Sequence, residues 1–200
     1  AFETVYNVPS DTDVWTDTGL GDATTYTYRV TPILAGGPGT AGPDCVATTL
    51  TAGDSTGRMR QNALNYWRAI GASRKSARMI AAIAAIDTDA QAALSTLQAD
   101  GSWADITYTD LAPGSNWTPR FHYERLQDMA RAWATPGAAL DQDPALLAGI
   151  LKAIDFIETK FNPSTSLAGG NWWWWQIGAP ERYGPALVLV RDQLGSTRLN

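Results

Sequence analysis

Four consecutive tryptophans, at positions 172–175, are the part of this sequence that most clearly suggests chemistry. Neither a helix nor a strand points adjacent side chains in one direction, so at least one or two of these indoles should be exposed or line a cleft. A flat indole can cover the apolar face of a pyranose ring, and its N–H group can bind a hydroxyl. The amide of the neighbouring Asn171 offers both a donor and an acceptor to a sugar. The pattern predicts a carbohydrate subsite; a tryptophan-rich packing plug between helices is the alternative.

The residues that most often bind metals or transfer protons are scarce. His122 is the only histidine, and we expect it to be structural or solvated, because a catalytic histidine needs an acid or base partner within reach. Cys45 is the only cysteine, so no intrachain disulfide can form, and we expect a small buried residue. One histidine and one cysteine do not favour a zinc site. We therefore predict neither a metal nor a cofactor.

The charged residues of the loops and helix ends leave two interpretations open. A pair of loop carboxylates could hydrolyse a glycosidic bond by acid–base catalysis, but an N-cap and turn residues explain the same aspartates more simply. Three arginines could add positive potential for an anionic chain, although such residues are more often surface or helix-ending charges. The aspartates are Asp105, Asp110, Asp141 and Asp143, and the arginines are Arg120, Arg125 and Arg182.

Composition excludes several broad classes of protein. The chain has 200 residues, enough for one or two domains, and 44% of them are hydrophobic, which argues against disorder. The net charge of -5 argues against a general nucleic-acid binder, which should carry a basic face. No apolar run approaches the roughly 18 residues that a membrane span needs, so we expect no membrane insertion.

The elements that must position these residues change in character near Gly53. Before it, residues 24–30 alternate so that Tyr26, Tyr28 and Val30 share one face, the period of a half-buried strand. We expect further strands at 14–18 and 44–50, and a break in the chain at the glycine-rich residues 36–39.

After Gly53 the apolar residues recur at steps of three and four, which predicts five or six helices. Three starts are signalled by a proline in the first turn, at Thr118-Pro119, Asp143-Pro144 and Ala179-Pro180. In the second helix, Asp87 and its neighbours could interrupt the run by acting as an N-cap. Loops of ten to twenty residues join the helices, and loops of such length are usually functional. The expected helices cover 59–70, 79–97, 118–133, 143–161 and 179–194.

The tryptophan motif resembles a known signature. Asn171-Trp172-Trp173, followed by Trp175-Gln176-Ile177-Gly178-Ala179-Pro180, resembles the N-W-W-x-[WY]-[EQ]-I-G-x-P signature of polysaccharide lyase family 8, which includes hyaluronate, chondroitin AC and xanthan lyases. Residues 103–108 resemble the family's loop after its second helix, and residues 123–133 resemble its "YxRLxxMAxAY" helix. The resemblance covers about residues 56–200.

The resemblance implies a mainly α fold, a partial (α/α) toroid followed by β-sandwich domains in the same polypeptide. It implies β-elimination of an anionic, uronate-containing polysaccharide, in which a tyrosine moves the protons while an asparagine and a histidine neutralise the carboxylate. Asn171, Trp172, Trp173 and Trp175 are the substrate-binding residues it implies here. The catalytic residues are expected beyond residue 200, so the isolated chain should be inactive. A secreted protein is expected.

A second resemblance concerns the β part. Residues 15–50 resemble the second half of a fibronectin type III domain, whose sandwich normally takes about 100 residues. The first strands are missing, so we expect a piece of a longer protein, with a partial fibronectin type III-like segment at 1–53 and the first half of the lyase toroid at 54–200. The alternative is a small β-meander packed on the helical part.

Two departures from the lyase signature leave the substrate open. The family usually has an acidic residue where Trp174 stands, and glutamate is commonest where Gln176 stands. Hyaluronan, chondroitin and xanthan all remain candidates. Two other functions stay open at this point: an α/α-barrel glycoside hydrolase, and a non-catalytic carbohydrate-binding module.

Overall fold

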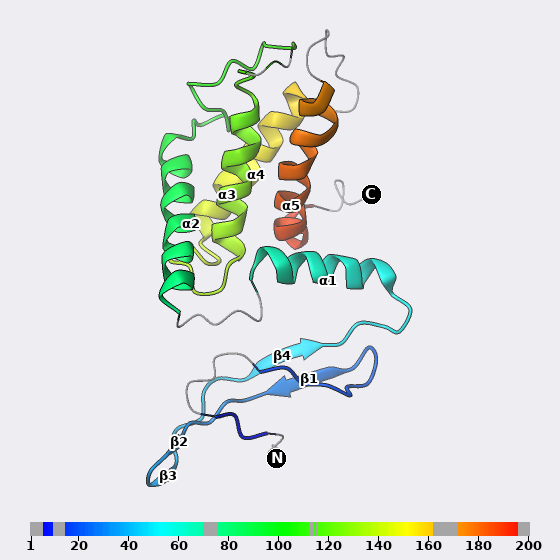
Figure 1. Cartoon of the computed structure of the whole chain (residues 1–200), viewed down its shortest axis with the longest axis vertical. Helices are drawn as coiled ribbons and strands as arrows, with labels where there is room; N and C mark the ends of the chain where they lie inside the picture. Colours follow the sequence, from blue (N-terminus) through cyan, green and yellow to red (C-terminus); the bar gives the residue numbers. More distant parts are fainter. Residues whose placement is uncertain are drawn as a thin grey trace. The chain divides into compact units, whose positions relative to one another are not determined.

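The computed structural model describes residues 6–9, 15–69, 76–112, 114, 116–161 and 172–195. Contacts divide the chain into two compact units, a β unit and a helical unit, and the main boundary falls between Asn62 and Ala63. This boundary lies within the first helix, α1 (Ser55–Trp67). The elements of both units are labelled in Figure 1.

Two short antiparallel strand pairs make up the sheet structure of the β unit. Strand β1 (Thr25–Tyr28) pairs with β4 (Cys45–Thr48), and β2 (Ile33–Leu34) pairs with β3 (Gly37–Pro38). The predicted alternation is confirmed for Thr25–Tyr28, because the tyrosines of β1 are half-buried while its threonines are exposed. It does not extend to Val30, which lies outside the strand and is 74% exposed. The assignment of residues 1–53 to a fibronectin type III-like segment stays a prediction.

Three local predictions for the β unit are wrong. Cys45 is exposed, because all four residues of β4 are exposed and this small strand pair offers it no core. Residues 15–18 form no strand; Trp15 instead stacks on Tyr6, with the ring centroids 5.9 Å apart. The glycine-rich segment does not simply break the chain, because β3 lies within it and pairs with β2.

The helical unit is built around one central helix. Helix α3 packs against α2, α4 and α5, and Figure 1 shows it between α2 and α5. The elements after α1 are α2 (Ala77–Thr96), α3 (Arg120–Ala134), α4 (Pro144–Lys160), the π-helix η1 (Trp174–Gly178), α5 (Pro180–Val190) and the short 3-10 helix η2 (Arg191–Gln193). The mainly helical fold class is thus as predicted. The core contains Ala90, Trp103, Leu126, Met129, Ala130, Leu146, Ile150, Ile154, Ala186 and Val190.

Helix starts follow the sequence signals in two of three cases. The carboxylate of Asp143 accepts the backbone N–H of Leu146 at 2.7 Å, and Pro144 occupies the first turn of α4. Pro180 likewise opens α5. Thr118 does not cap α3, because its hydroxyl accepts the N–H of Thr107 at 3.0 Å and so holds the preceding loop instead.

Helix α2 runs without interruption through Asp87. The carboxylate of Asp87 accepts the backbone N–H groups of Ala139 at 2.7 Å and Leu140 at 3.1 Å. It therefore satisfies donors in the loop between α3 and α4, and does not break its own helix. Among the residues that the structure describes, none forms a helix both long enough and apolar enough to cross a membrane.

Candidate functional site

A π-helix places the tryptophan cluster, residues 172–175, between α4 and α5. Trp172 and Trp173 form a helical turn that leads directly into η1. The wider turn closes with the N–H of Ala179 donating to the carbonyl of Trp174 at 2.8 Å. Single π turns of this kind occur often at functional sites.

The four indoles have different surroundings. Trp172 is 62% exposed, whereas the other three are half-buried. Trp174 lies 6.4 Å from the fully buried Trp117, and Trp175 lies 6.1 Å from Phe161, both measured between ring centroids. The expectation that four adjacent tryptophans cannot share one core is confirmed, and the cluster combines an exposed edge with a packed base.

Gly178 allows two of the indoles to lie against the backbone. A Cβ atom at this position would stand 2.6 Å from Cζ3 of Trp173 and 2.7 Å from Cε3 of Trp174. Real Cβ atoms essentially never approach another atom so closely. The glycine of the motif is therefore needed where these two rings pack.

Two arginines lie against the same indole. The guanidinium carbon of Arg120 lies 5.3 Å from the centroid of Trp174, and that of Arg182 lies 5.6 Å from it. Both arginines face one carboxylate, Glu124, at 3.8 Å and 3.4 Å. Arg182 also donates to the carbonyl of Gly178 at 2.8 Å. We call Arg120 and Arg182 the arginine pair. From the sequence, two interpretations of these residues stayed open: ordinary surface charges, or a source of positive potential for an anionic chain.

The predicted substrate-binding residues are only partly open to comparison with the structure. Trp172, Trp173 and Trp175 lie within one turn, with Trp172 the most exposed of them and Trp175 turned to Phe161. Asn171 lies outside the described residues. Their assignment as sugar-binding residues stays a prediction.

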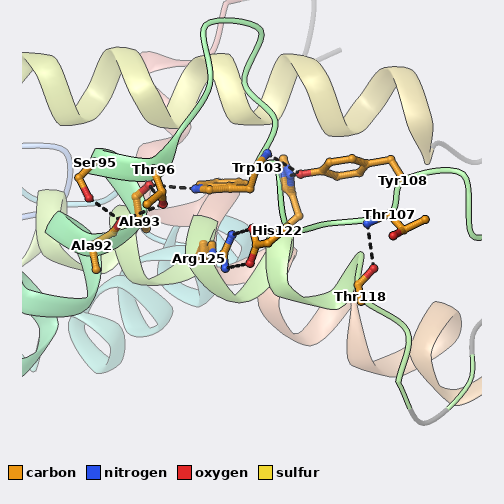
Figure 2. A network of polar contacts seen from close by, with 11 residues as sticks. Ala92, Ala93, Ser95, Thr96, Trp103, Thr107, Tyr108, Thr118, His122 and Arg125 are labelled. Atoms are coloured by element: carbon orange, nitrogen blue, oxygen red, sulfur yellow. Dashed lines mark hydrogen bonds and ion pairs between the residues drawn. The ribbon is translucent and has the colours of Figure 1, made fainter.

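A second polar cluster, the Trp103 network, lies where the loop after α2 meets α3 and α4 (Figure 2). Trp103 is 1% exposed, and its indole N–H donates to the carbonyl of Ala93 at 2.9 Å. Its backbone N–H donates to the hydroxyl of Tyr108 at 3.1 Å, and that hydroxyl lies 2.9 Å from Nδ1 of His122. Nε2 of His122 lies 3.0 Å from the carbonyl of Ala153.

These bonds fix the tautomer of His122. A carbonyl oxygen can only accept, so Nε2 carries the proton, and Nδ1 accepts from Tyr108. His122 is fully buried, and burial is the main cause that lowers its pKa to about 3; the bond to Ala153 opposes this and the charge of Arg125 adds to it. The histidine is therefore neutral and structural, and the solvated alternative is wrong.

An ion pair closes the Trp103 network. Arg125 donates to both carboxylate oxygens of Asp105, at 2.7 Å and 2.6 Å, and its guanidinium carbon lies 5.4 Å from the Trp103 centroid. The hydrogen bonds from Arg125 hold the pKa of Asp105 below its usual value. Asp105 is thus not set up as a general acid.

Two other aspartates considered for hydrolysis also have structural roles. Asp143 is an N-cap, and Asp110 accepts the N–H of Ala112 at 3.0 Å in a turn. The simpler interpretation of these residues is the one that the contacts favour. Within the described ranges, no group of three or more histidine, cysteine, aspartate or glutamate side chains could hold a metal ion.

The contact between the arginine pair and Trp174 was not predicted from the sequence. One signal was present: Arg120 and Glu124, and likewise Gly178 and Arg182, are four residues apart, the spacing that puts two positions on one face of a helix. Spacing within a helix does not show that residues of α3 and α5 meet over one indole.

The helical unit is similar to known proteins. Residues 67–200 match the family described as polysaccharide lyase family 8, N terminal alpha-helical domain. Chondroitinase-AC from Pedobacter heparinus is 32% identical over 106 residues, which are 53% of this chain and 14% of that protein. Hyaluronate lyase HylB from Enterococcus faecalis is 35% identical over 82 residues, 41% of this chain and 8% of that protein.

A solved structure supports the same relationship. The chondroitin AC lyase of Streptomyces coelicolor A3, solved in complex with chondroitin sulphate, matches with a TM-score of 0.60 and 25% identity. The match covers 71% of this chain and 19% of that chain. The chain thus spans less than a fifth of the length of each of these relatives.

Proposed function

The chain belongs to polysaccharide lyase family 8, and on that premise we propose that it forms part of an enzyme that cleaves a uronate-containing polysaccharide by β-elimination. In this proposal the segment supplies an aromatic wall, Trp172 and Trp173, against which one sugar of the substrate lies. The residues that transfer protons belong to other parts of the polypeptide, beyond residue 200. The enzyme acts outside the cell, where such polymers occur.

One observation carries the proposed role: an exposed indole stands on a base that packing holds in place. Trp172 is 62% exposed, while the next three tryptophans are half-buried against Trp117, Phe161 and Gly178. Pre-organised aromatic side chains lose little conformational entropy when a ligand binds. An indole face covers the apolar side of a sugar ring without requiring a charge on it. Such a contact suits an anionic polymer whose carboxylates point away from the indole face.

The charge of the neighbourhood also supports an anionic substrate. Two guanidinium groups, those of Arg120 and Arg182, share one carboxylate, that of Glu124, so these three side chains together carry one net positive charge. The whole chain is acidic, with a net charge of -5. A local positive site in an acidic chain can favour the approach of an anionic polymer to that site.

The experiment that tests the proposal follows elimination directly. The full-length protein that contains this chain is incubated with hyaluronan, chondroitin sulphate and xanthan, and the ultraviolet absorbance of the unsaturated uronate product is recorded. A rise with one polymer supports the lyase and identifies its substrate. New reducing ends without a rise in absorbance would indicate a hydrolase, and binding without either product would indicate a carbohydrate-binding module.

The isolated chain provides the matching control. We expect it to give no unsaturated product from any of the three polymers, because the proton-transferring residues lie elsewhere in this proposal. Robust turnover by the 200 residues alone would contradict the assignment of the wall and catalytic residues to separate parts of the polypeptide.

A further inference from the structure

We propose that Arg120 and Arg182 are positioning residues, which fix the aromatic wall by packing against Trp174. This inference rests on the proposed function, because it assigns the pair a part in substrate binding. It concerns residues that make no contact with the substrate themselves and act only through the indole they pack against.

Trp174 is held from several directions. The two guanidinium carbons lie 5.3 Å and 5.6 Å from its centroid, and the ring of Trp117 lies 6.4 Å away. Its Cε3 atom lies where a Cβ atom on residue 178 would be only 2.7 Å away. A ring restrained in this way has little freedom to change rotamer.

Trp174 in turn fixes the wall. The ring of Trp173 meets that of Trp174 edge to face, with the centroids 4.9 Å apart and an interplanar angle of 82°. Trp173 also packs against Gly178, whose missing side chain leaves the space for it. Movement of Trp174 would therefore remove one of the surfaces that define the position of Trp173.

The charges explain why an indole suits this position. Among the described residues, Glu124 forms ion pairs with both guanidinium groups, so this set of three charged side chains has one positive charge in excess. The face of an indole carries a negative quadrupole and attracts a cation within about 6 Å. Nε of Arg120 is buried and has no hydrogen-bond partner in the part of the chain that the structure describes. Stacking on Trp174 and on Phe121, at 4.4 Å, is thus a main contact of this guanidinium.

Direct binding of the anionic polymer by the pair is the competing interpretation. Arg182 directs Nε toward Glu124 and Nη1 toward the carbonyl of Gly178, so part of its guanidinium is already engaged within the protein. The two interpretations differ in one measurable way. A positioning residue loses its effect when the residue it positions is removed, whereas a residue that binds substrate directly keeps its effect.

The test is a double-mutant cycle in the full-length protein, using the polymer that the wild type cleaves. Arg182→Met should raise KM about tenfold and change kcat less than about threefold, because the wall contributes to binding in the ground and transition states alike. In the Trp174→Ala background, Arg182→Met should raise KM no further. Arg120→Met should behave in the same way.

Two comparison variants make the test decisive. Arg182→Lys, which keeps the charge and loses the planar group, should give an intermediate KM and serves if Arg182→Met does not fold. Arg125→Met removes the arginine beside Trp103 and should lower Tm while leaving kcat and KM unchanged. An equal rise in KM in both Trp174 backgrounds, or an unchanged KM in the folded Arg182→Met variant, would overturn the proposal.

A spectroscopic readout separates this proposal from the proposed function. Edge-to-face indoles give a near-ultraviolet circular dichroism signal, which Arg182→Met and Trp174→Ala should each reduce. Their combination should equal Trp174→Ala alone, whether or not the protein cleaves any polymer. Additive changes would contradict the positioning role, even if lyase activity is found.

Discussion

The Trp103 network and the tryptophan cluster contain the same kinds of residue in different arrangements. Each has an arginine within 6 Å of an indole centroid and a carboxylate facing that arginine. In the Trp103 network one arginine meets one aspartate through two hydrogen bonds, and Trp103 is 1% exposed. In the cluster two arginines share Glu124, and Trp172 is 62% exposed. The first arrangement is a structural centre. In the second, the arginines lie against the half-buried Trp174, and the exposed indole, Trp172, stands two residues before it.

One helix serves both regions. Arg120 of α3 lies against Trp174 and Glu124 pairs with Arg182, whereas His122 and Arg125 of the same helix reach the Trp103 network. Because α3 also packs on α2, α4 and α5, the base of the wall is tied to the most contacted element of the fold. A site built on such a helix is held more accurately than one built on a loop.

The largest expected difference between the two regions concerns stability. Trp103→Ala should lower the free energy of unfolding by about 3–5 kcal/mol, because it removes a fully buried indole and its hydrogen bond to Ala93. Trp172→Ala should change it by less than about 0.5 kcal/mol, since that side chain is mostly in solvent. Urea denaturation of both variants measures this. Equal losses of unfolding free energy in the two variants would contradict the difference between the Trp103 network and the tryptophan cluster.

The next effect is on catalysis in the full-length enzyme. Replacing Trp172 and Trp173 together by alanine should reduce kcat/KM about a hundredfold, by analogy with stacking of flat rings on aromatic side chains, worth about 1–3 kcal/mol each. The rate of product formation at low substrate concentration measures it. If kcat/KM stays at the wild-type value in a folded double variant, the wall is a packing feature and the contrast with Trp103 disappears.

A smaller effect should follow from crowding the base of the wall. Gly178→Ala brings a Cβ atom within 2.6 Å of Trp173 and should cost about 1–3 kcal/mol of stability, with a raised KM. Gly184→Ala is the matched control in α5, because nothing except its chain neighbours and its own helix backbone lies within 4 Å of its Cβ position. Pro185 follows directly and disfavours a helical alanine before it, which offsets the helix propensity of alanine, so this control should change the stability by less than about 0.5 kcal/mol. Similar Tm values for the two variants would argue against tight packing at Gly178.

The sequence predicted elements more successfully than side-chain partners. Proline and aspartate signals located α4 correctly, and period-two alternation located β1, because these depend on local backbone chemistry. The burial and hydrogen bonding of Trp103, and the contact of Arg182 with Trp174, depend on which helices pack together. Local residue spacing does not encode this. Cys45 was placed wrongly for a related reason: burial statistics describe an average strand, and β4 is exposed throughout.

A further effect concerns the dependence of stability on pH along α3. The pKa of His122 is lowered to about 3, so between about 3 and 6.5 the unfolded chain binds a proton that the folded protein does not. This contribution to stability is complete above pH 6.5 and is lost as the pH falls toward 3. Burial raises the pKa of Asp128 to about 6, with Asp89 and Glu124 adding to the rise and Arg131 opposing it. Here the folded protein binds the extra proton, so stability falls as the pH rises from about 4 to about 6.

Asp128→Asn separates the two opposing slopes. Removal of the half-buried carboxylate should raise the free energy of unfolding at pH 7 by about 1–2 kcal/mol, and should make the loss of stability between pH 6 and pH 4 steeper, because the His122 contribution then acts alone. The same substitution at Asp105 should act in the opposite direction at pH 7, since the pKa of that carboxyl is lowered by Arg125. Urea denaturation at a series of pH values measures all three proteins. A lower stability of Asp128→Asn at pH 7 would mean that Asp128 makes a favourable charged contact, and that α3 holds a second closed ion pair like the one beside Trp103.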